Sequence, residues 1–181
     1  MKDFKIYPDT HPYLRCKCEE VSSPFSSEIK KTLLDMIEYL KLSQDNEYAT
    51  KHNIRPGVGL SANQIGITKR FFAMYLIDSD KEYKYGLINP KIISSSVTKA
   101  YLPSGEGCLS VITPHPGIVY RYFKIKMKGF DVVTNQEVTL SLQGYPAIVA
   151  QHEYDHLNGL LFYDRINEEN PLYIDPDAIE V

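Results

Sequence analysis

The stretch GYPAIVAQHEYDHLNG, residues 144–159, constrains the fold more than any other part of the chain. Pro146 suits a first helical turn and Gly159 suits the residue just past a helix end, so the stretch predicts a helix of about three turns. His152 and His156 are four residues apart and therefore lie on one helix face. Apolar residues precede them on the same stripe, so we expect this helix to be buried with its histidines.

A glutamate directly after the first histidine indicates hydrolytic chemistry at a metal ion. In a helix, Glu153 lies roughly 100° round from His152, so it can reach a water at the ion without being a ligand. This is the logic of the pattern His-Glu-x-x-His, in which two imidazoles bind the metal and the carboxylate takes a proton from water. A helix with two hydrogen-bonded core histidines and no metal is the alternative.

The third metal ligand is missing from this stretch, although a catalytic site of this kind needs three protein ligands. One protease pattern supplies a later histidine, but Phe162 occupies that position. Another protease pattern supplies a glutamate from a later helix. Because Pro171 and Pro176 interrupt the remaining chain, we do not expect a later helix that could supply this glutamate. Neither protease pattern therefore fits the sequence well.

A cysteine upstream is the preferred third ligand. Cys108 lies in SGEGCLSV, residues 104–111, which predicts a tight glycine-containing loop. Cys16 and Cys18 compete for the role, but RCKCEE is highly charged and predicts a solvated segment. An isolated cysteine is more often an ordinary buried residue, so that alternative stays open.

The other elements predict an α+β fold, with mostly antiparallel strands around the central helix that contains the histidines. Apolar residues at helical spacing follow Ser26 or Ser27 and predict a helix, for which either serine suits the N-cap. The polar segment 43–57 predicts a long surface loop. Strands are expected at 70–78, 85–89, 91–97, 117–133 and 137–142, with a turn at Thr134-Asn135. Since no repeat or low-complexity linker interrupts the chain, we expect one catalytic domain over residues 1–181.

Composition excludes several classes of function. The net charge is −3, so nothing predicts direct nucleic-acid binding, and no apolar run approaches the roughly 20 residues that span a bilayer. The N-terminal MKDFKIYPDT is not of signal-peptide type, and three cysteines do not make a disulfide framework. We therefore expect a cytoplasmic protein with no membrane partner.

Three stretches, taken in order, resemble the peptide deformylase family. They are GVGLSANQ (57–64), EGCLS (106–110) and QHEYDH (151–156). The resemblance covers nearly the whole chain and is closest to the longer form found in Gram-positive bacteria. Ser61 stands where the family usually has alanine, a small-for-small change that we expect to affect packing more than chemistry.

The resemblance implies a metal-dependent hydrolase that removes the N-formyl group from formyl-methionine at the start of new polypeptides and releases formate. It implies metal ligands Cys108, His152 and His156, a catalytic carboxylate Glu153, and oxyanion donors in the Gln64 side chain and the Leu109 amide. It also suggests, more loosely, that Arg121 pairs with Glu106 behind the site.

Substrate binding is expected to use an apolar pocket for the methionine side chain and main-chain pairing with the peptide. The candidate residues are Val58, Gly59, Tyr145, Ile148 and Val149, for each of which a core role is the alternative. The implied cofactor is one divalent metal ion, Fe²⁺ first, with Zn²⁺, Ni²⁺ or Co²⁺ as alternatives. Partners are formylated nascent peptides, and proximity to the ribosome follows by analogy with the family. A His-Glu-x-x-His metallopeptidase and a non-catalytic metal-binding module are the rival functions.

Overall fold

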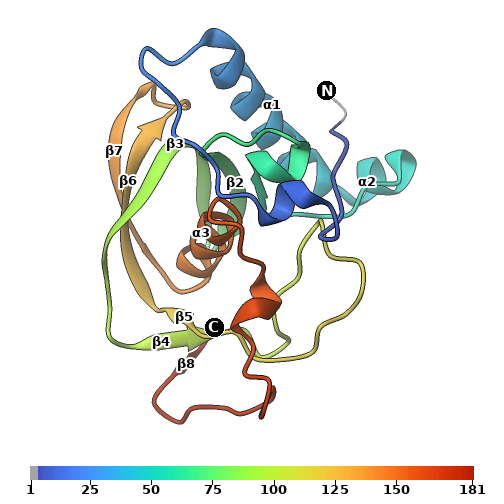
Figure 1. Cartoon of the computed structure of the whole chain (residues 1–181), viewed down its shortest axis with the longest axis vertical. Helices are drawn as coiled ribbons and strands as arrows, with labels where there is room; N and C mark the ends of the chain where they lie inside the picture. Colours follow the sequence, from blue (N-terminus) through green and yellow to red (C-terminus); the bar gives the residue numbers. More distant parts are fainter. Residues whose placement is uncertain (1–3) are drawn as a thin grey trace.

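An antiparallel sheet packed on one central helix forms the body of the structure, a computed structural model that describes residues 4–181 (Figure 1). The strands are β1 (Gly59–Ser61), β2 (Phe71–Asp78), β3 (Lys81–Ser95), β4 (Lys99–Tyr101), β5 (Arg121–Tyr122), β6 (Lys124–Asp131), β7 (Gln136–Gln143) and β8 (Ile179–Glu180). The α-helices are α1 (Ser27–Ser43), α2 (Asn46–His52) and α3 (Tyr145–His156). Short 3₁₀ helices are η1 (Pro12–Arg15), η2 (Ala62–Ile65) and η3 (Phe162–Arg165).

The main sheet has the strand order β1-β2-β3-β6-β7, and every neighbouring pair in it is antiparallel. A smaller sheet, in the order β5-β4-β8, lies near the C-terminal end of the chain (Figure 1). Among residues 4–181, β1 is an edge strand of the main sheet and pairs with β2 alone. One side of β1 is therefore available for pairing with another extended chain.

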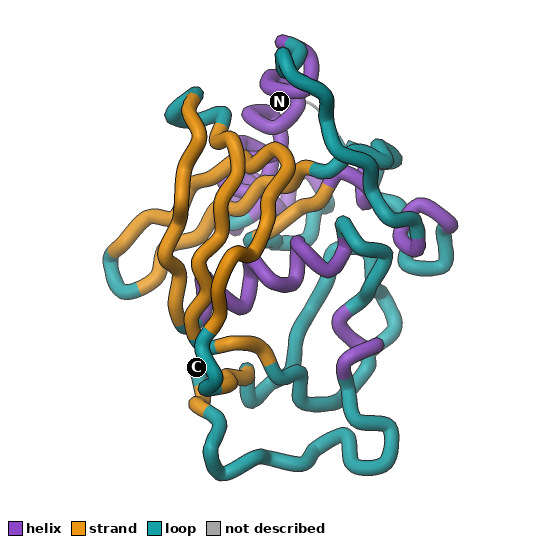
Figure 2. Tube along the Cα trace, turned by 60° about the vertical axis from the view of Figure 1, so that its left-hand side comes forward, coloured by secondary structure: helices purple, strands orange, loops and turns teal. Residues whose placement is uncertain are grey.

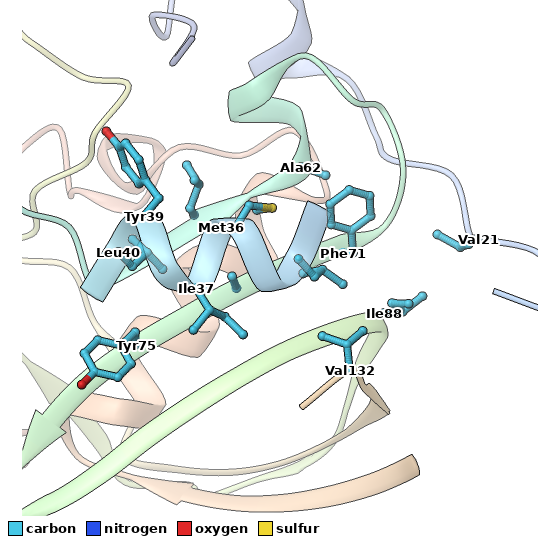
Figure 3. Packing of buried hydrophobic residues seen from close by; sticks show 13 residues of the cluster. Val21, Met36, Ile37, Tyr39, Leu40, Ala62, Phe71, Tyr75, Ile88 and Val132 are labelled. Atoms are coloured by element: carbon cyan, nitrogen blue, oxygen red, sulfur yellow. The ribbon is translucent and has the colours of Figure 1, made fainter. Parts of the chain in front are cut away.

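Helices α1 and α3 pack on opposite faces of the main sheet. Successive side chains of a strand point to opposite faces. In β2, Phe71 and Tyr75 join the cluster that contains α1, whereas Phe72 and Met74 join the cluster that contains α3. Figure 3 shows the first cluster, with α1 laid over the strands. Figure 2 shows the strands of the sheet with helices packed against them. Both faces of the sheet are thus buried where the site forms.

Helix α3 is buried on nearly all sides, as expected for a central helix. Proline occupies its first turn, as the sequence predicts. Gly159 has φ +75°, and a Cβ there would lie 2.6 Å from the carbonyl oxygen of Arg15. The turn after α3 therefore needs glycine on both conformational and steric grounds. The predictions of this helix and of α1, with Ser26 as its N-cap, are confirmed.

The prediction of one long loop over 43–57 is wrong, because α2 occupies its middle. The Asp45 side chain accepts a hydrogen bond from the Tyr48 main-chain N–H and caps this helix. Only Ala49 is buried in it, so the segment has no apolar stripe for the sequence to reveal.

The prediction of two strands at 85–89 and 91–97 is also wrong, because β3 runs unbroken through Pro90. Its pairing with β6 shifts between Ile88 and Lys91, so an irregularity accommodates the residue that lacks an N–H. The segment 117–133 is strand only within β5 and β6. The α+β class, with an antiparallel sheet, is confirmed. Within residues 4–181, no helix combines the length and apolar character needed to cross a bilayer.

Candidate active site

Three side chains from two distant segments converge beside α3. Cys108 Sγ lies 3.3 Å from His156 Nε2, and His156 Nε2 lies 3.1 Å from His152 Nε2. All three candidate ligand atoms lie within 4.8 Å of one another. Tetrahedral ligands at about 2.0–2.3 Å from one ion are themselves roughly 3.3–3.7 Å apart. One thiol and two imidazoles in this arrangement therefore suit a single divalent transition-metal ion.

The competing cysteines are elsewhere in the structure. Cys18 is 4% exposed in the cluster beneath the sheet, and burial raises the pKa of its thiol to about 11. A metal-binding cysteine must be a thiolate, so this environment opposes ligation. The prediction that RCKCEE is solvated is wrong for Cys18, which is buried in the core. The Phe162 ring stacks near the His152 ring, at 6.2 Å between centroids, and offers no ligand atom.

A buried chain of charges lies behind the histidines. His152 Nδ1 lies 2.8 Å from Glu106 Oε2, and Arg121 makes two 2.8 Å hydrogen bonds to the same carboxylate. Arg121 also donates to Asp155, which accepts further hydrogen bonds from Arg165. The expected pairing of Arg121 with Glu106 is thus present, and it extends through two more residues to η3.

The charge state of Glu106 determines how His152 is held. Burial alone would raise the pKa of Glu106, but the hydrogen bonds and charge of Arg121, helped by His152, lower the pKa to about 2. The ionised carboxylate accepts from Nδ1–H of His152 and leaves its Nε2 to face the Cys108 thiol. A carboxylate behind a ligating imidazole fixes its tautomer and orientation.

Glu153 is buried about 100° round the helix from His152, under very different conditions. Burial raises the pKa of its carboxyl to about 7, because it outweighs the lowering by the charges of His152 and Arg121. Among residues 4–181, no hydrogen-bond partner reaches its Oε2. A Cβ at Gly59 would lie 2.2 Å from Glu153 Oε1, so the carboxylate packs directly on the β1 main chain. Glycine at this position is what admits the carboxylate to the cavity.

Gln64 is held by hydrogen bonds at both ends of its amide. Its Oε1 accepts from the main-chain N–H of Ser61 at 2.8 Å and lies 2.9 Å from the Ser61 hydroxyl. Its Nε2 lies 3.1 Å from Ser110 Oγ and 3.5 Å from Cys108 Sγ. The hydroxyl of Ser61 therefore contacts the amide that we expect to be catalytic.

A cavity of about 430 Å³ brings the candidate residues together. Its lining includes all five expected substrate-binding residues and all but one of the expected catalytic and ligand residues: Val58, Gly59, Gln64, Cys108, Leu109, Tyr145, Ile148, Val149, His152 and Glu153. His156 is 1% exposed and lies beneath Cys108 and His152. A cavity of this size, apolar with a few convergent polar groups, suits a small ligand or a peptide end.

Sequence reasoning missed three residues that the structure places around the site. Asp155 and Arg165 extend the buried charges behind His152, and Arg55 contacts the loop that contains Cys108. Asp155 follows His152 by three residues on one helix, which was a signal that the two could share a face. The two arginines meet the site only through the tertiary fold, so no local pattern predicts them.

The fold and site together indicate a class: a hydrolase with a candidate metal site, formed by the two histidines of a His-Glu-x-x-His helix and a cysteine. Residues 3–171 match the family model of polypeptide deformylase. The chain belongs to the peptide deformylase family.

Relatives of the chain lie among Gram-positive bacteria. A peptide deformylase of Staphylococcus epidermidis is 51% identical over 183 residues, covering 100% of this chain and 98% of its own length. A peptide deformylase of Macrococcus caseolyticus is 50% identical with the same coverage. The crystal structure of peptide deformylase from Thermotoga maritima matches with TM-score 0.71 and 33% identity, over 92% of this chain and 99% of that one.

Proposed function

We propose that the chain is a single catalytic domain that removes the N-formyl group from formyl-methionine at the start of newly made polypeptides, releasing formate. Membership of the peptide deformylase family supports this reaction. One observation supports the assignment to this site above all others. The atoms of Cys108, His152 and His156 cluster within 4.8 Å beside a buried carboxylate, Glu153, that has an oxygen without a partner among residues 4–181.

The cofactor we propose is one divalent ion held by Cys108, His152 and His156, with Fe²⁺ as the physiological ion and Zn²⁺, Ni²⁺ or Co²⁺ as alternatives. The mixed sulfur and nitrogen donor set fits all of these ions. When bound, the ion would lower the pKa of a water to about 7 and polarise the formyl carbonyl. Glu106 would keep His152 in the tautomer that such an ion needs.

Glu153 is assigned the proton transfers. Its raised pKa, about 7, allows it to accept and return a proton near neutral pH. It takes a proton from the attacking water, whose oxygen forms a bond to the formyl carbon. The carbon–nitrogen bond then breaks as Glu153 delivers the proton to the leaving amine. Contact with Gly59 fixes the carboxylate for both steps.

Two hydrogen-bond donors are assigned to stabilise the negative charge that develops on the formyl oxygen. Gln64 supplies Nε2, oriented through its fixed Oε1, and Leu109 supplies its main-chain N–H. Donors that are already oriented stabilise a developing oxyanion without reorganisation, and losing one typically costs about 10²–10³ in rate.

Substrate recognition is assigned to the cavity and the edge of the sheet. The side chains of Val58, Tyr145, Ile148 and Val149 would form the methionine pocket. Gly59 lies in the edge strand β1, so a peptide could pair with its main chain as an added strand. Main-chain pairing tolerates many sequences after the first residue.

Formate release tests the reaction directly. Anaerobically prepared, iron-loaded protein is expected to release formate from formyl-Met-Ala and to leave Met-Ala. Cys108→Ala should lose both the metal and the activity, whereas Cys16→Ala, a matched change of a half-buried free thiol, should keep both. A metallopeptidase would instead retain its metal in Cys108→Ala. Loaded protein without turnover would contradict the proposal.

We also propose that the protein works in the cytoplasm close to ribosomes, where formylated nascent chains emerge. Co-sedimentation of the protein with ribosomes that bear nascent chains tests this proximity. Recovery only in the ribosome-free fraction would argue against it.

A further inference from the structure

Arg55 contacts the turn that contains Cys108 and Leu109. Its Nη1 donates to the carbonyl oxygen of Val111 at 3.3 Å, and its Nη2 donates to the carbonyl oxygens of Cys108, at 3.4 Å, and Leu109. The turn is closed by a hydrogen bond from the Val111 N–H to the Cys108 carbonyl oxygen at 3.2 Å. A planar guanidinium presents its donors in a rigid fork, so it orients the carbonyls that it binds.

The segment that contains Arg55 is itself anchored to the rest of the fold. The Gly57 N–H donates to Ser43 Oγ at 3.0 Å, and the Gly57 carbonyl oxygen accepts from Gln44 Nε2 at 2.9 Å. Both partners belong to the C-terminal end of α1. A Cβ at Gly57 would lie 2.7 Å from Leu109 Cδ1, so this segment contacts Leu109 through its side chain as well.

We propose that Arg55 is a positioning residue that fixes the Cys108–Val111 turn, and thereby aims the Leu109 N–H at the oxygen of the scissile formyl group. The inference rests on the proposed function, which assigns that N–H to the developing oxyanion. Arg55 acts through the turn, because its donors are directed at three of the turn's carbonyls.

Other contacts would keep the turn in place without Arg55, but less firmly. The Ser110 carbonyl oxygen accepts from the Asp9 N–H at 2.9 Å, and Ser110 Oγ contacts Gln64. Removing the guanidinium should therefore loosen the turn and leave the fold intact. Because a misplacement of about 1 Å can cost roughly 10²-fold in rate, we expect a 10- to 100-fold loss in kcat.

Steady-state kinetics with formyl-Met-Ala separate positioning from substrate binding. Arg55→Ala should lower kcat about 10- to 100-fold and change KM less than about three-fold, as expected for an interaction used in the transition state. Arg55→Lys keeps the charge without the fork and should recover only part of kcat. Lys51→Ala, which removes an exposed charge from the last turn of α2, should stay within about two-fold of the parent. A higher KM with unchanged kcat would overturn the proposal.

Amide hydrogen exchange tests the turn without reference to turnover. In zinc-loaded protein followed by NMR, the Val111 amide should exchange at least about ten-fold faster in Arg55→Ala, with a melting temperature close to the parent's. Unchanged Val111 exchange in Arg55→Ala and Arg55→Lys would overturn the proposal. A parent protein without formate release would overturn the proposed function instead, while this exchange measurement would still decide whether Arg55 fixes the turn.

Discussion

Two buried carboxylates beside His152 have opposite properties. Glu106 lies behind His152, where burial is outweighed by Arg121 and His152, and its pKa is lowered to about 2. Glu153 faces the cavity, where burial dominates, and its pKa is raised to about 7. The comparison shows that burial alone does not set the charge of a carboxylate, because the partners that burial brings decide the outcome.

The two regions also differ in how completely their hydrogen bonds are satisfied. Behind His152, the side chains of Glu106 and Asp155 are buried and both pair with the buried Arg121. At the cavity, Glu153 keeps an oxygen without a partner among the described residues. A fully paired network holds its members in place, whereas an unpaired buried group is available to bind a proton or substrate.

Replacing the cavity carboxylate should have the largest effect. We expect Glu153→Gln to lower turnover by about 10²–10⁴-fold, because the amide keeps the size of the side chain but cannot accept the proton. Metal content should stay unchanged, since Glu153 is not one of the clustered ligand atoms. Formate release and metal analysis of the same sample check both statements. Activity within ten-fold of the parent would contradict the role of Glu153.

Replacing Glu106, which pairs with Arg121 behind His152, should mainly lower the stability of the fold and the retention of metal. Glu106→Ala leaves Arg121 buried with only Asp155, and breaking a buried pair typically costs about 3–5 kcal/mol. It also frees His152, so metal affinity should fall about 10- to 100-fold. Urea unfolding and metal titration measure the two effects. A fall of less than about 1 kcal/mol in the free energy of unfolding would contradict the expected contribution of this pair to stability.

The two carboxylates should give opposite dependences on pH in the metal-free protein. Folded Glu153 binds its proton more tightly than the unfolded chain does, so its stabilisation is present below about pH 4.5 and is lost as the pH rises through about 7. Glu106 stabilises above about pH 4.5, and that contribution is lost as the pH falls through about 2. Each carboxyl should change the free energy of unfolding by about 3 kcal/mol over its pH range.

Carboxyl ¹³C NMR of the metal-free protein measures both groups directly. We expect one glutamate to titrate near neutral pH and to disappear in Glu153→Gln. The Glu106 signal should keep its ionised position down to acidic pH. If the two signals titrated together near pH 4.5, the contrast between the two regions would be wrong.

An exposed ion pair of similar length should contribute least. Lys31 Nζ lies 2.9 Å from Asp35, close to the 2.8 Å between Arg121 and Glu106, but the Lys31 side chain is 76% exposed. We expect Lys31→Ala to lower the free energy of unfolding by only about 0.3–0.5 kcal/mol. Urea unfolding provides the measurement, and a loss above about 2 kcal/mol would show that pair distance matters more than burial.

Local patterns predicted the two longer helices. Helix α1 was found because apolar residues recur on one face and Ser26 suits its N-cap. Helix α3 was found because Pro146 suits its first turn and Gly159 suits the residue past its end. Helix α2 was missed because only Ala49 is buried in it. The break expected at Pro90 did not occur, since pairing with β6 absorbs the irregularity.

The candidate site could be predicted only in part from the residues themselves. The spacing of His152 and His156 indicated two ligands, and the glycine-containing loop favoured Cys108 over the charged segment that contains Cys16 and Cys18. The resemblance to a family supported that choice. In the structure the Cys108 thiol joins the two histidines, whereas the Cys18 thiol is buried in the core and its pKa is raised to about 11. Arg55 has no sequence signal, because its contacts join segments more than fifty residues apart.

The sequence by itself determined that two imidazoles and a carboxylate lie close together, because helix geometry fixes the relation of residues 152, 153 and 156. The tertiary structure decided the rest. It brought a thiol from 48 residues away to His156, and it gave Glu106 an arginine as hydrogen-bond partner, whereas no partner among residues 4–181 reaches Glu153 Oε2. The reason is that ligand distance and pKa depend on groups from other segments, which meet only when the chain is folded.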